Sequence, residues 1–168
     1  MKYYINQKVL SFRDTFSIMN ANQHQVYEIK GRFFSLRNHL EMIDNRGVIV
    51  LTAQKRLFRF LPTYHIYNLR DQEVALVKRK FSFRPKFDLR ISYRNYQVDG
   101  SLFGHNFGIY DDNSDLVASI SKKIISWGDT YEIIVNDEEK IEILLFVVII
   151  IDQVVHERDT SGVSFEIN

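Results

Sequence analysis

The most constraining feature of this 168-residue chain is an apolar run near its C-terminus, residues 141–151, whose one polar residue is Glu142. Its many β-branched residues favour a strand locally, but about twenty residues pass without a turn signal, which is too long for a typical strand. The flanks are typical of a helix, because Asn136 and Glu139 have the spacing of a cap and its acidic partner. Acidic residues precede the run and basic ones follow it, as a helix dipole favours. We therefore predict a helix over about residues 138–158, followed by a short tail over residues 159–168.

Such a helix is apolar on every side, so it has to be buried on every side. A transmembrane span needs about 20 predominantly apolar residues, whereas the uninterrupted run here covers residues 143–151. A helix over residues 141–157 would be roughly 25 Å long, which is about the length of an eight-residue strand. We therefore prefer a core helix enclosed by a closed barrel of strands to a transmembrane helix.

The first 136 residues are patterned as strands, with apolar positions at period two in short runs. In the clearest run, residues 87–94, Phe87, Leu89, Ile91 and Tyr93 alternate with polar residues. Turn-forming residues separate many of the runs, at residues 44–47, 68–71, 99–100 and 111–115. Connections this short pair neighbouring strands antiparallel. The sequence thus predicts a mostly β fold in one domain over residues 1–168, a closed antiparallel barrel formed by residues 1–136 around the hydrophobic helix.

The net charge of +1 hides two strongly charged segments. Residues 55–94 hold 11 basic and 3 acidic residues, a net charge of +8, and residues 111–159 hold 12 acidic and 4 basic residues, a net charge of −8. A chain of this kind can present a positive face to an anionic partner without being basic overall.

The best candidate binding site is a basic hairpin within residues 78–94. Lys78 and Lys80 share one strand face by parity, as do the basic residues from Arg84 to Arg94 if the second strand is regular that far. Clustered cations attract phosphates on lipid head groups or nucleic acids, and they also occur on ordinary solvated sheet faces. Nucleic acid is the least favoured partner, because its dedicated binders are usually basic overall. The candidate anion-binding residues are Lys78, Arg79, Lys80, Arg84, Lys86, Arg90 and Arg94.

Two polar residues interrupt the C-terminal helix. Asp152 and His156 lie one turn apart on the same helix face. A buried carboxylate must be paired or hydrogen-bonded, so we expect both residues to be structural, with Asp152 reaching the barrel wall. They could instead be two metal ligands or an acid/base pair, but no third partner is evident.

Several classes of site find no support in the sequence. The absence of cysteine excludes disulfides, thiolate metal sites and a cysteine nucleophile. Nucleotide-binding glycine loops and hydrolase or metalloprotease motifs are also absent. We therefore expect no metal, no cofactor and no enzymatic activity, although a catalytic group assembled in space would leave no such motif. Because the N-terminus lacks the apolar stretch of a signal peptide, we expect a cytoplasmic protein.

The sequence resembles the LURP-one-related family over roughly residues 1–158. The resemblance rests on Phe16-Ser17-Ile18, residues 27–31 (Tyr-Glu-Ile-Lys-Gly), Phe34-Ser35-Leu36, Leu40 and Asp44, Gly47, Pro62 and Tyr64, and the terminal apolar helix. This family is grouped with the tubby C-terminal domain and the phospholipid scramblases. The resemblance implies a twelve-stranded antiparallel barrel around a C-terminal hydrophobic helix, and it implies no catalytic residues. The tubby relatives suggest binding of phosphoinositide head groups, and the scramblases suggest another form of lipid association, although their cysteine-rich segment is absent here.

Together these observations predict a non-enzymatic binding module that recognises anionic phospholipid head groups or phosphate ligands through the basic hairpin, at the inner membrane surface. A protein-interaction or scaffold domain, with a protein partner on the barrel surface, is the first alternative. A small enzyme or carrier with a pocket at the barrel mouth is the second.

Overall fold

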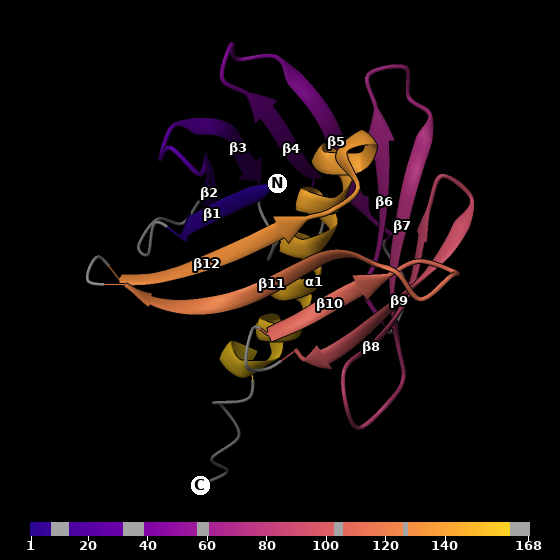
Figure 1. The fold of residues 1–168 in the computed structure, drawn as a ribbon. Coiled ribbons are helices and arrows are strands. Elements are labelled where there is room, and N and C mark those ends of the chain that lie inside the picture. The colour runs from indigo at the N-terminus through magenta and orange to yellow at the C-terminus, as the bar shows by residue number, and fades with distance from the viewer. Residues whose placement is uncertain (8–13, 32–38, 57–60, 103–105, 126–127, 162–168) are drawn as a thin grey trace, which may run out of the picture.

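The computed structural model describes residues 1–7, 14–31, 39–56, 61–102, 106–125 and 128–161, and in them the chain forms a closed barrel around one helix (Figure 1). Each strand pairs antiparallel with the next, and β1 pairs with β12 to close the wall. The predicted barrel is confirmed. Its strands are β1 (Lys2–Gln7), β2 (Asp14–Asn20), β3 (Gln25–Gly31), β4 (His39–Asp44), β5 (Ile49–Lys55), β6 (Thr63–Asn68), β7 (Glu73–Lys80), β8 (Lys86–Ile91), β9 (Arg94–Ser101), β10 (Asn106–Tyr110), β11 (Leu116–Ile125) and β12 (Gly128–Val135).

The apolar run forms the central helix. A single 3₁₀ turn, η1 (Glu138–Lys140), leads into α1 (Ile141–Ser161), which runs through the barrel (Figure 1). Every residue from Leu144 to Ile151 is at most 2% exposed, so the helix is covered on all sides, as its composition requires. Within the described part of the chain, no helix is long and apolar enough to cross a membrane.

The cap of the helix differs from the prediction. The carboxylate of Asp137, one residue after Asn136, accepts a hydrogen bond from the backbone N–H of Glu139 at 3.2 Å. The Asn136 side chain instead donates its Nδ2–H to the carbonyl of Leu116 at 2.8 Å and ties the helix entry to β11. Asn and Asp both cap helices well, and Asp137 is the cap because it directly precedes the 3₁₀ turn.

The inward face of the wall follows the period-two pattern. Phe87, Leu89 and Ile91 of β8 are buried as predicted. Tyr93 is 86% exposed, because β8 ends at Ile91 and a tight turn follows. The helix lies close to β5 and β7, which present the small buried side chains Ala53 and Ala75.

Four hairpins share one turn design. In each, the side chain of an Asn or Asp accepts hydrogen bonds from the backbone N–H groups two and four residues later, and the third residue after it has positive φ. Such Asx turns satisfy backbone donors locally. The predicted turns at residues 44–47, 68–71 and 111–115 follow this design, whereas residues 99–100 lie inside β9 and not in a turn. The four capping residues are Asn20, Asp44, Asn68 and Asp111.

These turns all lie at the end of the barrel where the helix begins. There the Tyr27 hydroxyl donates to Glu142 Oε1 at 3.1 Å. At the other end, an Arg79 guanidinium N–H donates to the carbonyl of Val154 at 3.3 Å. Because antiparallel strands alternate in direction, the loop between β7 and β8 lies at this second end, where the helix finishes.

The buried helix generates a stability prediction. Val148 is 0% exposed, so Val148→Asp places an unpaired charge in the core and should cost more than about 3 kcal/mol, a large fraction of the stability of an ordinary domain. Chemical denaturation followed by circular dichroism measures the loss. The matched control is Val48→Asp, in an exposed turn, which should stay close to the parent protein. A Val148→Asp variant as stable as this control would contradict a central helix.

Candidate anion-binding site

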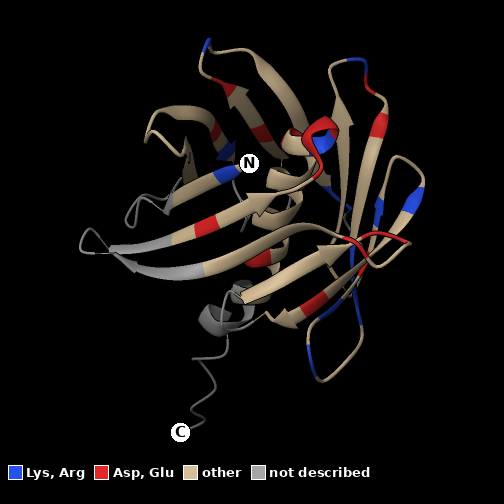
Figure 2. Cartoon of the chain, in the orientation of Figure 1, with Lys and Arg blue, Asp and Glu red and all other residues tan. Residues whose placement is uncertain are grey.

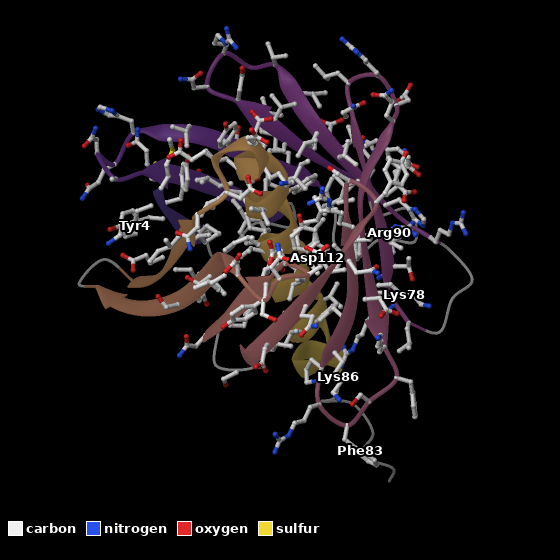
Figure 3. All side chains as sticks on the ribbon, turned by 45° about the vertical axis from the view of Figure 1, so that its right-hand side comes forward. Tyr4, Lys78, Phe83, Lys86, Arg90 and Asp112 are labelled. Atoms are coloured by element: carbon white, nitrogen blue, oxygen red, sulfur yellow. The ribbon has the colours of Figure 1, made fainter. Side chains whose placement is uncertain are left out.

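The predicted basic hairpin is formed by β7, a loop over residues 81–85 and β8. The register places Lys80 opposite Lys86, Lys78 opposite Asp88 and Leu76 opposite Arg90. The side chains of β7 and β8 alternate between the core and the outer surface. Lys78, Lys80, Lys86 and Arg90 therefore share the outer face, and Figure 3 shows Lys86, Lys78 and Arg90 one after another along it.

The outer face of β7, β8 and β9 is hollowed into a groove of about 500 Å³, which we call the basic groove. Its lining includes four cations and one carboxylate, a formal net charge of +3. Amide groups from β9 border it, and Leu76 adds an apolar contact. The outward-facing lining residues are Leu76, Lys78, Lys80, Lys86, Asp88, Arg90, Asn95 and Gln97.

The cations of the groove differ in how they are compensated. Lys80 forms an ion pair with Asp88, and Arg90 forms one with Glu73 at 3.3 Å. Among the residues that the structure describes, no carboxylate pairs with Lys78 or Lys86. Lys80 and Lys86 are also direct cross-strand neighbours, and like charges in that position repel each other. The groove thus holds positive charge that a bound anion would neutralise.

A polar cluster borders the groove on β6 and β7. His65 Nδ1 lies 2.7 Å from Glu73 Oε2, and the His65 ring stacks on Tyr67. Burial alone would raise the pKa of Glu73, but hydrogen bonds and charges from His65 and Arg90 together hold that pKa below its usual value. Glu73 is therefore a stable carboxylate that partly compensates Arg90.

Arg79 does not belong to the groove. It belongs to the basic stretch that the sequence offers as an anion site, but its position in β7 points inward and it is only 5% exposed. Its guanidinium binds the carbonyl of Val154 on the helix. Arg79 is thus a structural contact between wall and helix, and including it among the anion ligands was wrong.

Two further candidates lie away from the groove. Arg84 is exposed in the loop over residues 81–85. Arg94 is at the opposite end of the hairpin, because Ser92 and Tyr93 form a turn with φ values of 48° and 67° and Arg94 begins the next strand. The prediction that Arg94 shares a face with Arg84 and Lys86 was therefore wrong.

The sequence interpretation also missed two aromatic residues. Phe81 is 93% exposed and Phe83 is 108% exposed, both in the loop between β7 and β8. We call this pair the aromatic tip, and Figure 3 shows Phe83 at the far end of the hairpin. The available signal was Phe-Ser-Phe between Lys80 and Arg84, where strand alternation has stopped and nothing predicts burial.

Of the helix pair Asp152 and His156, the structure describes the side chain of Asp152 only. Asp152 is 8% exposed and has an interaction partner, as expected of a buried carboxylate. The side chain of His156 lies outside the described residues. No cluster of three or more potential metal ligands occurs among the side chains that the structure describes.

A smaller cavity of about 280 Å³ lies at the barrel mouth beside the helix start. It is lined by Val50, Asn68, Leu69, Arg70 and Glu142. Burial raises the pKa of the nearby Tyr27 hydroxyl, and the charge of Glu142 and its hydrogen bond to Tyr27 add to the effect. Tyr27 is therefore a neutral donor to Glu142, a contact that holds the helix start to β3.

Comparison with known proteins gives consistent matches over nearly the whole chain. The family model described as LURP-one-related matches residues 1–152. The uncharacterised protein YxjI of Bacillus subtilis (strain 168) is 32% identical over 164 residues, which cover 97% of this chain and 99% of that protein. The X-ray structure of a protein from Arabidopsis thaliana has a similar fold, with a TM-score of 0.62 and 20% identity over 90% of each chain.

The lowered pKa of Glu73 generates a pH-dependent prediction. A carboxylate with a lowered pKa stabilises the folded state above its ordinary pKa, and this contribution is lost as the pH falls through the lowered value. Glu73→Gln should therefore reduce the free energy of unfolding at neutral pH, by less than about 1 kcal/mol because solvent screens the pair. The deficit should shrink below about pH 4.

Denaturation of both proteins across this pH range tests the prediction. Glu28→Gln, which removes a charge on β3, serves as the control for the general effect of charge. A deficit for Glu73→Gln that stays constant down to the acid limit would show that the His65 and Arg90 contacts do not stabilise the carboxylate.

Proposed function

The chain belongs to the LURP-one-related family, and we propose that it is a non-enzymatic module that binds anionic phosphate groups in the basic groove. The phosphate is carried by a phospholipid head group or by a smaller phosphate ligand. We place this binding on the cytoplasmic side, at the inner membrane surface. The proposal depends most on one observation, the excess of four cations over one carboxylate in the groove, where Lys80 and Lys86 are direct cross-strand neighbours.

The dimensions and chemistry of the groove support this ligand class. Its volume of about 500 Å³ lies within the roughly 300–1,000 Å³ of typical small-ligand sites. Lysine ammonium groups bind phosphate as point charges, and a guanidinium can add a bidentate contact. Lys78 and Lys86 would bind the anion directly, while Lys80 and Arg90 would reorganise from their carboxylate partners toward it.

The distribution of charge over the barrel would orient such an encounter. In Figure 2, Lys and Arg mark the strands that lead into the loop between β7 and β8, and Asp and Glu mark η1 at the other end of the helix. The turn over residues 111–115, at that same end, adds three aspartates. An anionic surface therefore attracts one end of the molecule and repels the other.

The first test removes the two uncompensated cations. The double variant Lys78→Ala, Lys86→Ala should bind vesicles of equal parts phosphatidylcholine and phosphatidylserine about thirtyfold more weakly, at roughly 1 kcal/mol per cation near the surface. Sedimentation with vesicles at low salt measures this, and added salt should weaken binding of the parent chain.

The matched control has the same change in net charge. Lys2→Ala, Lys30→Ala removes two lysines that are paired with Glu132 and Glu28 on the opposite side of the barrel, and it should keep most of the binding. Equal losses in the two double variants, or no binding by the parent chain, would refute the groove as the site. Lack of binding would favour the protein-interaction alternative.

A second test should strengthen binding. Asp88→Asn removes the carboxylate that pairs with Lys80 inside the groove, so a bound anion no longer competes with that carboxylate for Lys80. We expect tighter binding to the same vesicles, by about fivefold for roughly 1 kcal/mol. Asp112→Asn, in the exposed turn at the opposite end, has the same charge change and should have a smaller effect. An Asp88→Asn variant that gains no more than this control would contradict the proposal.

A further inference from the structure

The aromatic tip is an apolar surface with no partner in the described chain. Phe83 at 108% and Phe81 at 93% are the most exposed of the large hydrophobic side chains that the structure describes, followed by Tyr93 at 86%, in the turn at the other end of the hairpin. An exposed phenylalanine alone is ordinary. Two fully exposed rings on a single loop are less so, because their burial elsewhere would be strongly favourable.

The tip is also held in a defined place. It connects two strands that are paired up to Lys80 and Lys86, and Pro85 at its base is buried. The wall is closed, so β7 and β8 are not edge strands open to pairing with another chain. The rings therefore project from the end of a supported hairpin, at the end of the barrel where the helix finishes.

Cations surround the base of the tip. Lys80, Arg84 and Lys86 are all exposed and lie within three residues of a phenylalanine. Lys80 and Lys86 end the two paired strands directly behind the loop that carries the rings, and apolar side chains at a bilayer interface reach roughly 5–10 Å into the boundary between head groups and acyl chains. Rings among the upper acyl chains would thus bring these cations level with lipid phosphates.

We propose that the aromatic tip inserts into the interface of an anionic bilayer, so that the basic groove binds lipid head groups rather than free phosphate. This inference depends on the proposed function, since the groove supplies the electrostatic attraction. The tip adds an apolar contribution that a soluble phosphate ligand cannot provide. We identify the partner of the tip as a bilayer because the cations around the tip complement lipid phosphates. The acidic end of the barrel then faces away from the bilayer.

The direct test uses the absence of cysteine in the chain, which allows a single dye to be attached. Ser82→Cys, between the two rings, is labelled with an environment-sensitive fluorophore and mixed with vesicles of equal parts phosphatidylcholine and phosphatidylserine. We expect a blue shift and quenching by lipids that carry a quencher on the acyl chain. The control is Leu69→Cys with the same dye, in an exposed turn at the other end, which should show neither change. No change at Ser82 with bound vesicles would overturn the insertion.

A second test needs no label. The double variant Phe81→Ser, Phe83→Ser should bind the same vesicles about a hundredfold more weakly, since the transfer of each ring contributes roughly tenfold. Leu69→Ser, which also removes an exposed apolar side chain, should bind as the parent chain does. Inorganic phosphate, as a competitor for the groove, should act equally on the parent and the double variant.

The outcomes separate the two proposals. Loss of vesicle binding in Lys78→Ala, Lys86→Ala but not in Phe81→Ser, Phe83→Ser leaves the groove as the site and overturns insertion, which leaves the rings free to contact a protein. If neither double variant loses binding, both proposals are wrong.

Discussion

The structure depends on one requirement, the burial of a helix that is apolar on every side. A sheet packed on one face of α1 would leave the opposite face in water, so the wall has to surround it. Twelve antiparallel strands do so, and the residues from Leu144 to Ile151 are at most 2% exposed. Closing the wall also removes its free edges, which would otherwise be open to pairing with another chain. Small side chains such as Ala53 and Ala75 let the wall approach the helix closely.

This requirement moves binding to the outer surface. The interior is filled by the helix and by the inward side chains of the strands, as a close-packed core demands. The outward positions of the strands do not have to pack into the core, and in β7 and β8 several of them hold cations. Both cavities considered above are reached from outside, one on the outer face of β7–β9 and one at the mouth beside Glu142. The helix thus fixes the shape of the wall but not the chemistry of its outer surface.

Sequence patterns predict this fold well because burial leaves a period in the chain. The alternation of Phe87, Leu89 and Ile91 correctly identifies their inward face, and the uniform apolar run correctly identifies the central helix. The pattern fails where the backbone leaves the strand: Tyr93 continues the alternation in sequence, but positive φ values at Ser92 and Tyr93 turn the chain away. The same turn separates Arg94 from Lys86 and Arg90, with which regular strand parity would place it. Arg79 has charged neighbours on both sides in sequence, but strand parity places it inside the barrel. Which cations retain a carboxylate partner depends on cross-strand register, which a single sequence does not reveal.

The cations near the aromatic tip have two competing explanations, protection against aggregation and binding of an anionic surface. Exposed rings are an aggregation hazard, and neighbouring charges are a common protection against it. Protection would explain the exposed cations Lys80, Arg84 and Lys86 around the tip, since repulsion between molecules requires only that charges be near the rings. It would not explain why the positive charge continues along the same face to Lys78 and Arg90, away from the rings. It also gives no reason for Lys80 and Lys86 to face each other across the strands at an electrostatic cost. A continuous positive face that extends from the tip into a groove is what an anionic surface would contact, and that continuity favours binding over protection.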